Sequence, residues 1–482
     1  MEVRESASIV FSRKWLQALT LATVAAPSMA LALFVWRFGV NVLVSDDWDM
    51  VPLYQEIVNG KLGLIDLFAQ HNEHRIFFPR LAMLAIESLS SFNVIPEMYL
   101  SWALLTATVT IIFCVYRRFN RICDLKVIAY FLPISLLMFS FRQEGSILWG
   151  FECQIYLAVF CIVAAIFLLE KATRSGRSLV LAILAGIIAS YSFLLGLVVW
   201  PTGLVQIALS IDGTVSRVRS FVLWALSGVV VSALYVNGFR IPNSTAMSHN
   251  PLRMAEYFLA YIGAPFTFQL AYFSASIAGV LAIIAGLVFF QGLKGAVVRE
   301  NGVWISLIFF AVLSAAVTAV GRSGLGVTEA LSSGYTPISV LGVVGLYSFA
   351  LSVSKRYNGL GRRFPVHALL TLMLLALVVS AGAGWHIGQQ TRTEREIGIG
   401  VLQNYQKEPD IAISRYLTPN VSIVREWAPY LQANRLSVFS HGNQTDTSQL
   451  STAEWRVENW NEPVVELVGI GLACSEASSV SR

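Results

Sequence analysis

Long apolar runs separated by short polar loops fill the chain up to about residue 386, and the rest of the chain is mostly polar. A helix needs roughly 20 apolar residues to cross the hydrocarbon core of a bilayer, so the pattern predicts about eleven membrane-spanning helices. We therefore expect an all-α polytopic membrane protein, with a transmembrane domain at 1–388 and a small polar tail at 389–482. The spans are predicted at 15–36, 97–116, 127–141, 147–169, 179–195, 197–211, 220–236, 271–293, 303–320, 336–353 and 366–386.

Three segments have a second interpretation. The first apolar run follows basic residues, as in a signal peptide, but it exceeds the length of about 7–15 residues of a signal-peptide core, so we predict an uncleaved helix. The ranges 179–195 and 197–211 also fit one element broken around Trp200-Pro201. The amphipathic run at 76–92 is predicted to lie in the membrane surface. Counting it as a span would place the later loops that are rich in lysine and arginine on the opposite side of the membrane from the basic N-terminus.

Composition narrows the class of protein further. Hydrophobic residues make up 56% of the 482 residues and charged residues 13%, whereas soluble proteins carry about 25% charged residues. This balance excludes a disordered chain, a coiled coil and an ordinary soluble enzyme. The net charge of +5 does not suggest nucleic acid as a partner, and the five cysteines show no spacing typical of a metal site.

Lysine and arginine are concentrated at the N-terminus and in every second predicted loop. Cytoplasmic loops of polytopic proteins carry such an excess, so the N-terminus is predicted to be cytoplasmic. An odd number of spans then places the C-terminal tail on the outer side of the membrane.

The first predicted outer loop begins with three carboxylates, Asp46, Asp47 and Asp49, around Trp48. Mutual repulsion raises the pKa of at least one carboxyl in such a group, which can then act as a general base. Two of them together can hold a divalent cation such as Mg²⁺ or Mn²⁺. Trp48 is a candidate stacking surface for a substrate or an interface anchor, and a solvated loop is the alternative for the acids.

Five consecutive hydrogen-bonding side chains follow in the same loop: His71, Asn72, Glu73, His74 and Arg75. Arg75 offers a planar fork to a phosphate, and His74 can add a donor. Asn72 can orient a hydroxyl, and we group His71 and Glu73 with it as candidate substrate-binding residues. Metal binding by the two histidines and a simple polar turn are the alternatives.

Further polar residues lie at the same predicted outer ends of later spans. Glu152 stands in an apolar segment, where an ionisable group usually faces a cavity or a partner, and an ion pair with Arg142 is the structural alternative. Trp200 is a candidate for substrate binding or for helix packing. Arg322, flanked by glycines, and Tyr335 are candidates for phosphate binding, with an ordinary turn as the alternative for Arg322.

Charged residues are almost absent from the middle of the predicted spans. A transporter is expected to place charged residues there, between its helices. The position of the polar residues therefore favours chemistry on a lipid-linked substrate at the outer surface.

In these segments the chain resembles the GT-C superfamily of membrane glycosyltransferases, which carry an acidic motif in the first outer loop. Ser45-Asp46-Asp47-Trp48 matches that placement. A more specific resemblance, to a group of bacterial GT-C-like proteins, lies in 71–75, 148–154, 191–201 and 321–335. One departure from that group is Gly334-Tyr335, where the group carries Arg-Tyr.

The resemblance implies an inverting transfer of a sugar from a polyprenyl-phosphate donor to an envelope glycan or lipid, at the outer face of a bacterial inner membrane. Asp46 or Asp47 would be the general base. The leaving phosphate would need cationic stabilisation, by His74 and Arg75 or by Arg322. Two other functions stay open: a polymerase or ligase of the O-antigen type, and a transporter or flippase of lipid-linked substrates.

Overall fold

The computed structural model describes residues 2–119, 125–172, 174–210, 214–242, 247–267, 272–290, 295–356 and 360–440. Contacts divide the chain into two units, Met1–His441 and Gly442–Arg482, and the fold below belongs to the first unit. In the described residues this unit is helical apart from one short hairpin. The boundary predicted after residue 388 lies inside the long helix α17 (Leu360–Gln403).

Five helical segments among the described residues are long and apolar enough to cross a membrane, which identifies a multi-pass integral membrane protein. They are Ile95–Arg118, Gly150–Ala172, Ser216–Val236, Gly302–Leu325 and Ser333–Ser354. The predicted number of eleven is therefore wrong, although each predicted range overlaps a helix. Shorter apolar helical segments are also present among the described residues: α9 (Gly176–Ser190) has 15 residues and is about 22 Å long, less than the hydrocarbon thickness of about 30 Å.

The helices that form the five spans are α5 (Ile95–Phe119), α8 (Cys153–Ala172), α11 (Thr214–Val236), α15 (Gly302–Arg322) and α16 (Thr336–Arg356). The remaining helices of ten or more residues are α1 (Glu2–Phe38), α4 (Phe77–Ser90), α6 (Leu125–Met138), α9, α10 (Val199–Ala208), α12 (Pro251–Gly263), α13 (Tyr272–Phe290), α17 and α19 (Val421–Ala433). The shorter ones are α2 (Met50–Val58), α3 (Leu64–Phe68), α7 (Glu144–Ile147), α14 (Gly295–Glu300) and α18 (Asp410–Tyr416). Single 3₁₀ turns are η1 (Ser45–Asp49), η2 (Phe141–Gln143), η3 (Gly150–Glu152), η4 (Leu194–Val198), η5 (Ala264–Phe266), η6 (Ser323–Leu325), η7 (Val327–Leu331), η8 (Ser333–Tyr335) and η9 (Ser437–Phe439).

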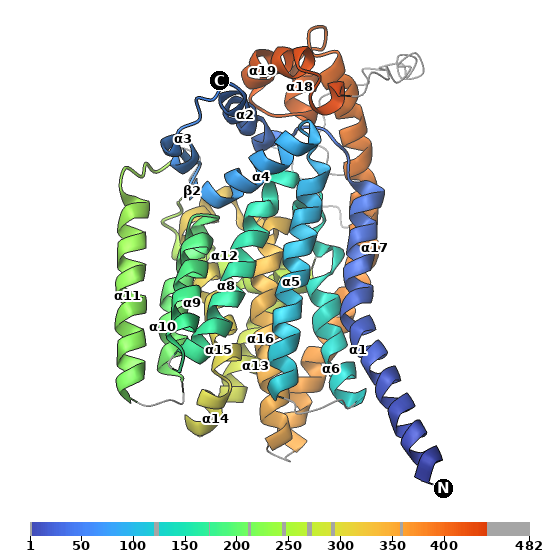
Figure 1. Cartoon of the computed structure of the whole chain (residues 1–482), viewed down its shortest axis with the longest axis vertical. Coiled ribbons are helices and arrows are strands. Elements are labelled where there is room, and N and C mark those ends of the chain that lie inside the picture. Colours follow the sequence, from blue (N-terminus) through green and yellow to red (C-terminus); the bar gives the residue numbers. More distant parts are fainter. Residues whose placement is uncertain are drawn as a thin grey trace, which may run out of the picture. The chain divides into compact units, whose positions relative to one another are not determined.

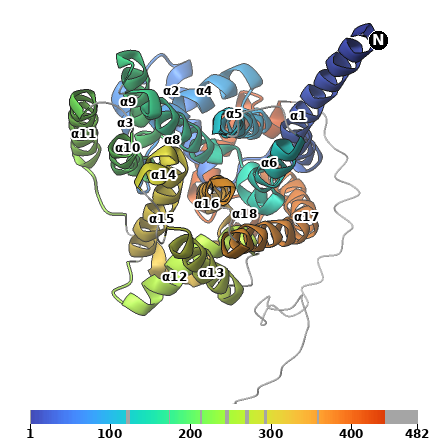
Figure 2. The same cartoon turned by 90° about the horizontal axis from the view of Figure 1, so that it is seen from below.

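The helices differ strongly in how much of their surface other helices cover. In the most apolar 18-residue stretch of the α16 span, 89% of the residues are buried, and α16 lies in the middle of the bundle when it is viewed along the helices (Figure 2). In the corresponding stretch of α11 only 28% are buried, and α11 stands at the edge. An apolar helix exposed in this way faces lipid in a membrane protein.

Short helices gather at one end of the bundle, at the top of Figure 1: α2, α3, α4, α18 and α19. The run at 76–92 forms α4, so the predicted helix is confirmed. Ser45 donates its backbone N–H to the carbonyl of Leu417 at 2.7 Å, which joins η1 to the C-terminal end of α18. We call this end of the bundle the capped end.

The predicted break between 179–195 and 197–211 exists, but it lies before the proline. α9 ends at Ser190, and the chain turns through Tyr191–Phe193 and η4 before α10 begins. Pro201 then stands in the first turn of α10, where its missing N–H leaves no hydrogen bond unmade.

Candidate functional site

The motif at 71–75 forms the hairpin. β1 (Gln70–His71) pairs antiparallel with β2 (His74–Arg75), with His71 opposite His74. Asn72 has a φ of 46° in the turn between the strands, a left-handed conformation that asparagine tolerates better than most residues. The turn therefore brings the two predicted histidines together.

His71 joins two of the three predicted aspartates. Its Nε2 lies 3.2 Å from Asp46 Oδ2, and its Nδ1 lies 3.4 Å from Asp49 Oδ2. Both aspartates belong to η1, and residues three apart in a 3₁₀ turn stand one above the other. The spacing of Asp46 and Asp49 is therefore what places both carboxylates on the same side, toward His71.

Asp47 points away from this group, because neighbouring residues of a 3₁₀ turn are rotated by about 120°. Its Oδ2 accepts the backbone N–H of Val44 at 2.9 Å, and its Oδ1 accepts the indole N–H of Trp149 at 3.1 Å. Burial raises the pKa of Asp47 to about 7, against the opposing effects of the Val44 N–H, the charge of Arg395 and the Trp149 hydrogen bond. Burial also raises the pKa of Asp49.

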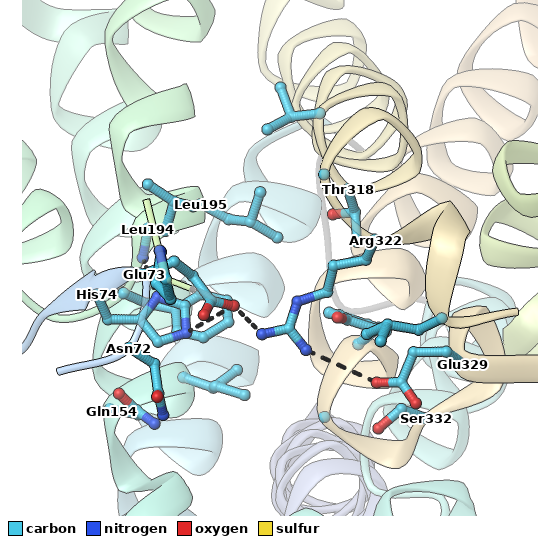
Figure 3. A pocket seen from close by; sticks show the side chains of 18 of the residues that line it. Asn72, Glu73, His74, Gln154, Leu194, Leu195, Thr318, Arg322, Glu329 and Ser332 are labelled. Carbon is cyan, nitrogen blue, oxygen red and sulfur yellow. Dashed lines mark hydrogen bonds and ion pairs between the residues drawn. The ribbon is translucent and has the colours of Figure 1, made fainter. Parts of the chain in front are cut away.

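A cavity of about 720 Å³ lies beside the hairpin (Figure 3), a size typical of a small-molecule site. Apolar residues form much of its wall, among them Val317 and Val320 of α15 and Phe193 before η4. Its polar lining residues are Asp46, Asn72, Glu73, His74, Glu152, Gln154, Thr318, Arg322, Glu329, Ser332 and Tyr335. The cavity is therefore amphiphilic, with a polar region beside an apolar wall.

Arg322, at the C-terminal end of α15, reaches across this cavity between two carboxylates (Figure 3). Its Nη2 pairs with Oε1 of Glu73 from the hairpin, and its Nη1 lies 3.7 Å from Oε1 of Glu329 in η7. Glu73 is buried and Glu329 is partly exposed. Burial raises the pKa of Glu329, while the charge of Arg322 opposes that effect.

His74 is held as a neutral imidazole. Burial lowers its pKa to about 3, and the charge of His71 acts in the same direction. Its Nδ1 accepts the backbone N–H of Leu194 at 3.1 Å, so the proton of the neutral ring is on Nε2, 3.6 Å from Glu73 Oε1. The ring also stacks on Phe193 with centroids 4.4 Å apart. His74 can therefore donate one hydrogen bond but brings no charge.

Arg75 has a different environment from the other predicted phosphate ligands. Its guanidinium donates to the backbone carbonyls of Tyr235 at 2.8 Å, Phe68 at 3.0 Å and Asn237 at 2.7 Å. Arg75 does not line the cavity described above. These contacts tie the hairpin to the end of α11 and favour a structural role for Arg75 over the predicted contact with a phosphate.

The remaining predicted residues divide into two groups. Asn72, Glu152 and Tyr335 line the cavity. Trp48 and Trp200 are buried and outside it: the indole of Trp48 donates to the carbonyl of Leu43, and that of Trp200 donates to Ser190 Oγ. Their predicted contact with a substrate has no support in this arrangement.

The alternative of an Arg142–Glu152 ion pair has no support among the contacts of the described residues. The guanidinium of Arg142 donates instead to the backbone carbonyls of Thr267 and Leu331.

Among the residues that the structure describes, Asp46, Asp49 and His71 together could hold a metal ion. One ligand atom from each lies within 4.8 Å of the others. Asp47, part of the predicted cation set, lies outside this group because its oxygens accept the two hydrogen bonds given above. A mixed set of carboxylate and imidazole ligands fits Mn²⁺ or Zn²⁺ better than Mg²⁺, which prefers oxygen alone.

Sequence reasoning missed three buried charged residues near Asp47. Arg395 of α17 donates to the carbonyl of Leu148 at 2.8 Å, and its charge acts on Asp47. Glu87 and Glu97 are almost fully buried, and burial raises the pKa of Glu87 well above its usual value. The available signal was a single acidic residue in each of two apolar helices, α4 and α5, and an arginine beyond the last predicted span.

Comparisons of the chain with protein-family models, with curated proteins and with solved structures gave no match.

Proposed function

We propose that the chain is an inverting glycosyltransferase that moves a sugar from a polyprenyl-phosphate donor to a glycan or lipid acceptor, at the outer face of a bacterial inner membrane. The observation that carries the proposal is a single cavity lined by the carboxylate of Asp46, the guanidinium of Arg322 and the apolar residues of α15. A base, a cation for phosphate and an apolar wall for the lipid are the features that this reaction needs in one place.

Asp46 is the general base in this proposal. A base must lie within hydrogen-bond reach of the proton that it removes, and Asp46 lines the cavity whereas Asp47 does not. Asp46 takes the proton of the acceptor hydroxyl as the hydroxyl oxygen bonds to the anomeric carbon. The bond from that carbon to the phosphate oxygen breaks, and polyprenyl phosphate leaves with the electron pair. His71, 3.2 Å from Asp46, orients the carboxylate.

Arg322 is the ligand of the donor phosphate. Its Nη1 lies 3.7 Å from Glu329, which is longer than a hydrogen bond, so an incoming phosphate oxygen can replace that carboxylate. The Nε2–H of His74 is a second, uncharged donor in the same region. Negative charge grows on the phosphate as the bond to the sugar breaks, and the Arg322 charge stabilises it.

A second, apolar cavity of about 390 Å³ offers a place for the lipid chain of the donor. It is lined by residues of α12, η5, α13, α15 and α16, all of them apolar apart from Tyr261 and Ser339. Tyr261 lines this cavity and Tyr335 lines the first one, and their ring centroids are 5.2 Å apart. A prenyl chain can therefore run from the phosphate along these two rings.

The test is transfer by the purified full chain in lipid nanodiscs, supplied with polyprenyl-phosphate sugars and membrane extracts as acceptor. Released polyprenyl phosphate is the readout. Asp46→Asn should slow release by about 10²- to 10⁴-fold, the usual contribution of a general base, and leave donor binding intact. Asp410→Asn, which changes an exposed aspartate paired with Arg425 in the cap, is the matched control. Full activity of Asp46→Asn would refute the proposed base, and no release from any donor would refute the proposed function.

A further inference from the structure

Two hydrogen-bond acceptors in the polar cavity have no donor among the residues that the structure describes. Glu152 Oε2, in η3, and Gln154 Oε1, in the first turn of α8, are buried and accept no hydrogen bond from the described residues. Both residues line the cavity, and Gln154 is only 4% exposed. A buried acceptor without a partner destabilises the folded protein, so this pair is suited to a ligand that brings donors.

The charge of the cavity is also unbalanced. Four carboxylates line it, and Arg322 is the one charged cation among the described lining residues, because His74 is neutral. Arg322 already lies against Glu73 and Glu329. Glu152 therefore has no counter-charge from the described lining residues, and a ligand that is cationic as well as a donor would supply it.

Gly334 leaves space in front of Glu152. A Cβ atom added at Gly334 would lie 3.9 Å from Glu152 Oε1 and 3.4 Å from Ile155 Cδ1, at ordinary contact distances. The glycine therefore puts no side chain into the space that a small cationic group would occupy. A side chain introduced at 334 would enter this space, which gives a way to fill it.

We propose that Glu152 and Gln154 form a subsite for a primary ammonium group, so that the ligand of this cavity carries a free amine. A primary ammonium has three N–H donors and one positive charge, which serve both acceptors and balance the carboxylate. In the polyprenyl-phosphate sugar of the proposed function, the amine is a substituent of the sugar. This assignment of the amine to the sugar rests on the proposed function. An amine-bearing lipid headgroup has the same chemistry and is the second source.

The experiment compares donors that differ only in the amine. Full-length protein in phosphatidylcholine nanodiscs, whose headgroups have no N–H donor, is titrated with undecaprenyl phosphate glucosamine and with undecaprenyl phosphate glucose. The dissociation constant of each is measured by microscale thermophoresis. The amine donor should bind at least about tenfold more tightly, the effect of one charge-assisted hydrogen-bonded pair.

Two variants locate the effect. Glu152→Gln keeps the shape but removes the charge, and should weaken binding of the amine donor about tenfold while leaving the glucose donor unchanged. Gly334→Arg should also remove the preference, because its guanidinium would occupy the subsite. Glu170→Gln, at the other end of α8 where Glu170 pairs with Arg118, is the matched control and should keep the preference.

The outcomes separate the subsite from the proposed function. Equal binding of the two donors by the wild type would overturn the subsite, and so would a preference that survives Glu152→Gln and Gly334→Arg. If neither donor binds, dihexanoyl phosphatidylethanolamine is titrated against dihexanoyl phosphatidylglycerol. A preference for the ethanolamine lipid that disappears in Glu152→Gln would support the ammonium subsite while refuting the glycosyltransferase, and its absence would overturn both.

Discussion

Replacing Asp47 by asparagine tests whether this buried carboxyl titrates near neutral pH. Burial raises the pKa of Asp47 from 3.8 to about 7, so the folded protein keeps the proton where the unfolded chain has lost it. The bound proton on Asp47 therefore stabilises the folded protein. This contribution to the free energy of unfolding is fully present below pH 3.8 and is lost as the pH rises to about 7. At about 1.4 kcal/mol per pH unit, this interval corresponds to a loss of about 4 kcal/mol in the free energy of unfolding.

The assay is the melting temperature of the purified wild type and of Asp47→Asn from about pH 5 to about pH 9. The amide turns an N–H toward one of the two groups that donate to Asp47, so at low pH, where Asp47 is protonated, the variant should be less stable by about 1–3 kcal/mol, and this deficit should shrink as the pH rises to about 7. The informative quantity is therefore the difference between the two proteins. The melting temperature of the wild type should fall relative to that of the variant as the pH rises to about 7. Above that pH, the two plots of melting temperature against pH should be parallel.

Parallel curves over the whole range would refute the reasoning, because they would mean that the Asp47 carboxyl does not change its proton binding between the folded and unfolded states. The charge of Asp47 also contributes to the raised pKa of Glu87, so the difference between the two proteins reports the titration of Asp47 together with its effect on Glu87. Asp410→Asn, which removes an exposed aspartate, reports the effect of losing one negative charge at the surface.

Three further predictions concern the cations of the site. Arg322→Gln should weaken donor binding by roughly 10- to 100-fold, because a charge-assisted contact to the phosphate is lost; unchanged affinity in a binding titration would assign the phosphate to another group. Arg75→Ala should lower the melting temperature, since three backbone carbonyls lose their donor at a cost of about 3 kcal/mol or more, and leave donor affinity unchanged. A loss of affinity at an unchanged melting temperature would contradict that assignment. EDTA treatment should leave transfer by the wild type unchanged, because Asp46 acts as a free base; a loss of activity that Mn²⁺ restores in the wild type but not in His71→Ala would reassign Asp46 from base to metal ligand.

The positions of the helices could be predicted from the sequence, but the number of spans could not. Apolar runs predict helices because an unsatisfied backbone is costly in an apolar environment, and every predicted range overlaps a helix. Hydropathy does not report where a helix ends inside an apolar run. The run around Tyr191 turns through η4, so α9 and α10 are both shorter than a span although the sequence stays apolar throughout.

The location of the candidate site could be predicted as well, but the direction of its side chains could not. Asp46, the 71–75 motif and Arg322 do come together, as the placement of polar residues at one end of the spans suggested. Asp46 and Asp47 are neighbours with different surroundings because η1 is a 3₁₀ turn, and no pattern in the sequence specifies that turn. Likewise, Arg75 binds carbonyls of α11 that are about 160 positions away in the chain, a contact that only the tertiary fold creates.

The length of α17 has a consequence for the position of the capped end. Its 44 residues extend over about 66 Å, roughly twice the hydrocarbon thickness of a bilayer. Arg395 of α17 donates a hydrogen bond to the carbonyl of Leu148, beside the site. Leu417, which follows α17 in the chain, accepts the backbone N–H of Ser45, the neighbour of Asp46. Inserting one residue in α17 would move the residues that follow it by about 1.5 Å along the helix axis and rotate them by about 100° about that axis. The register of this one helix therefore sets the position of Asp46 relative to the membrane-spanning helices.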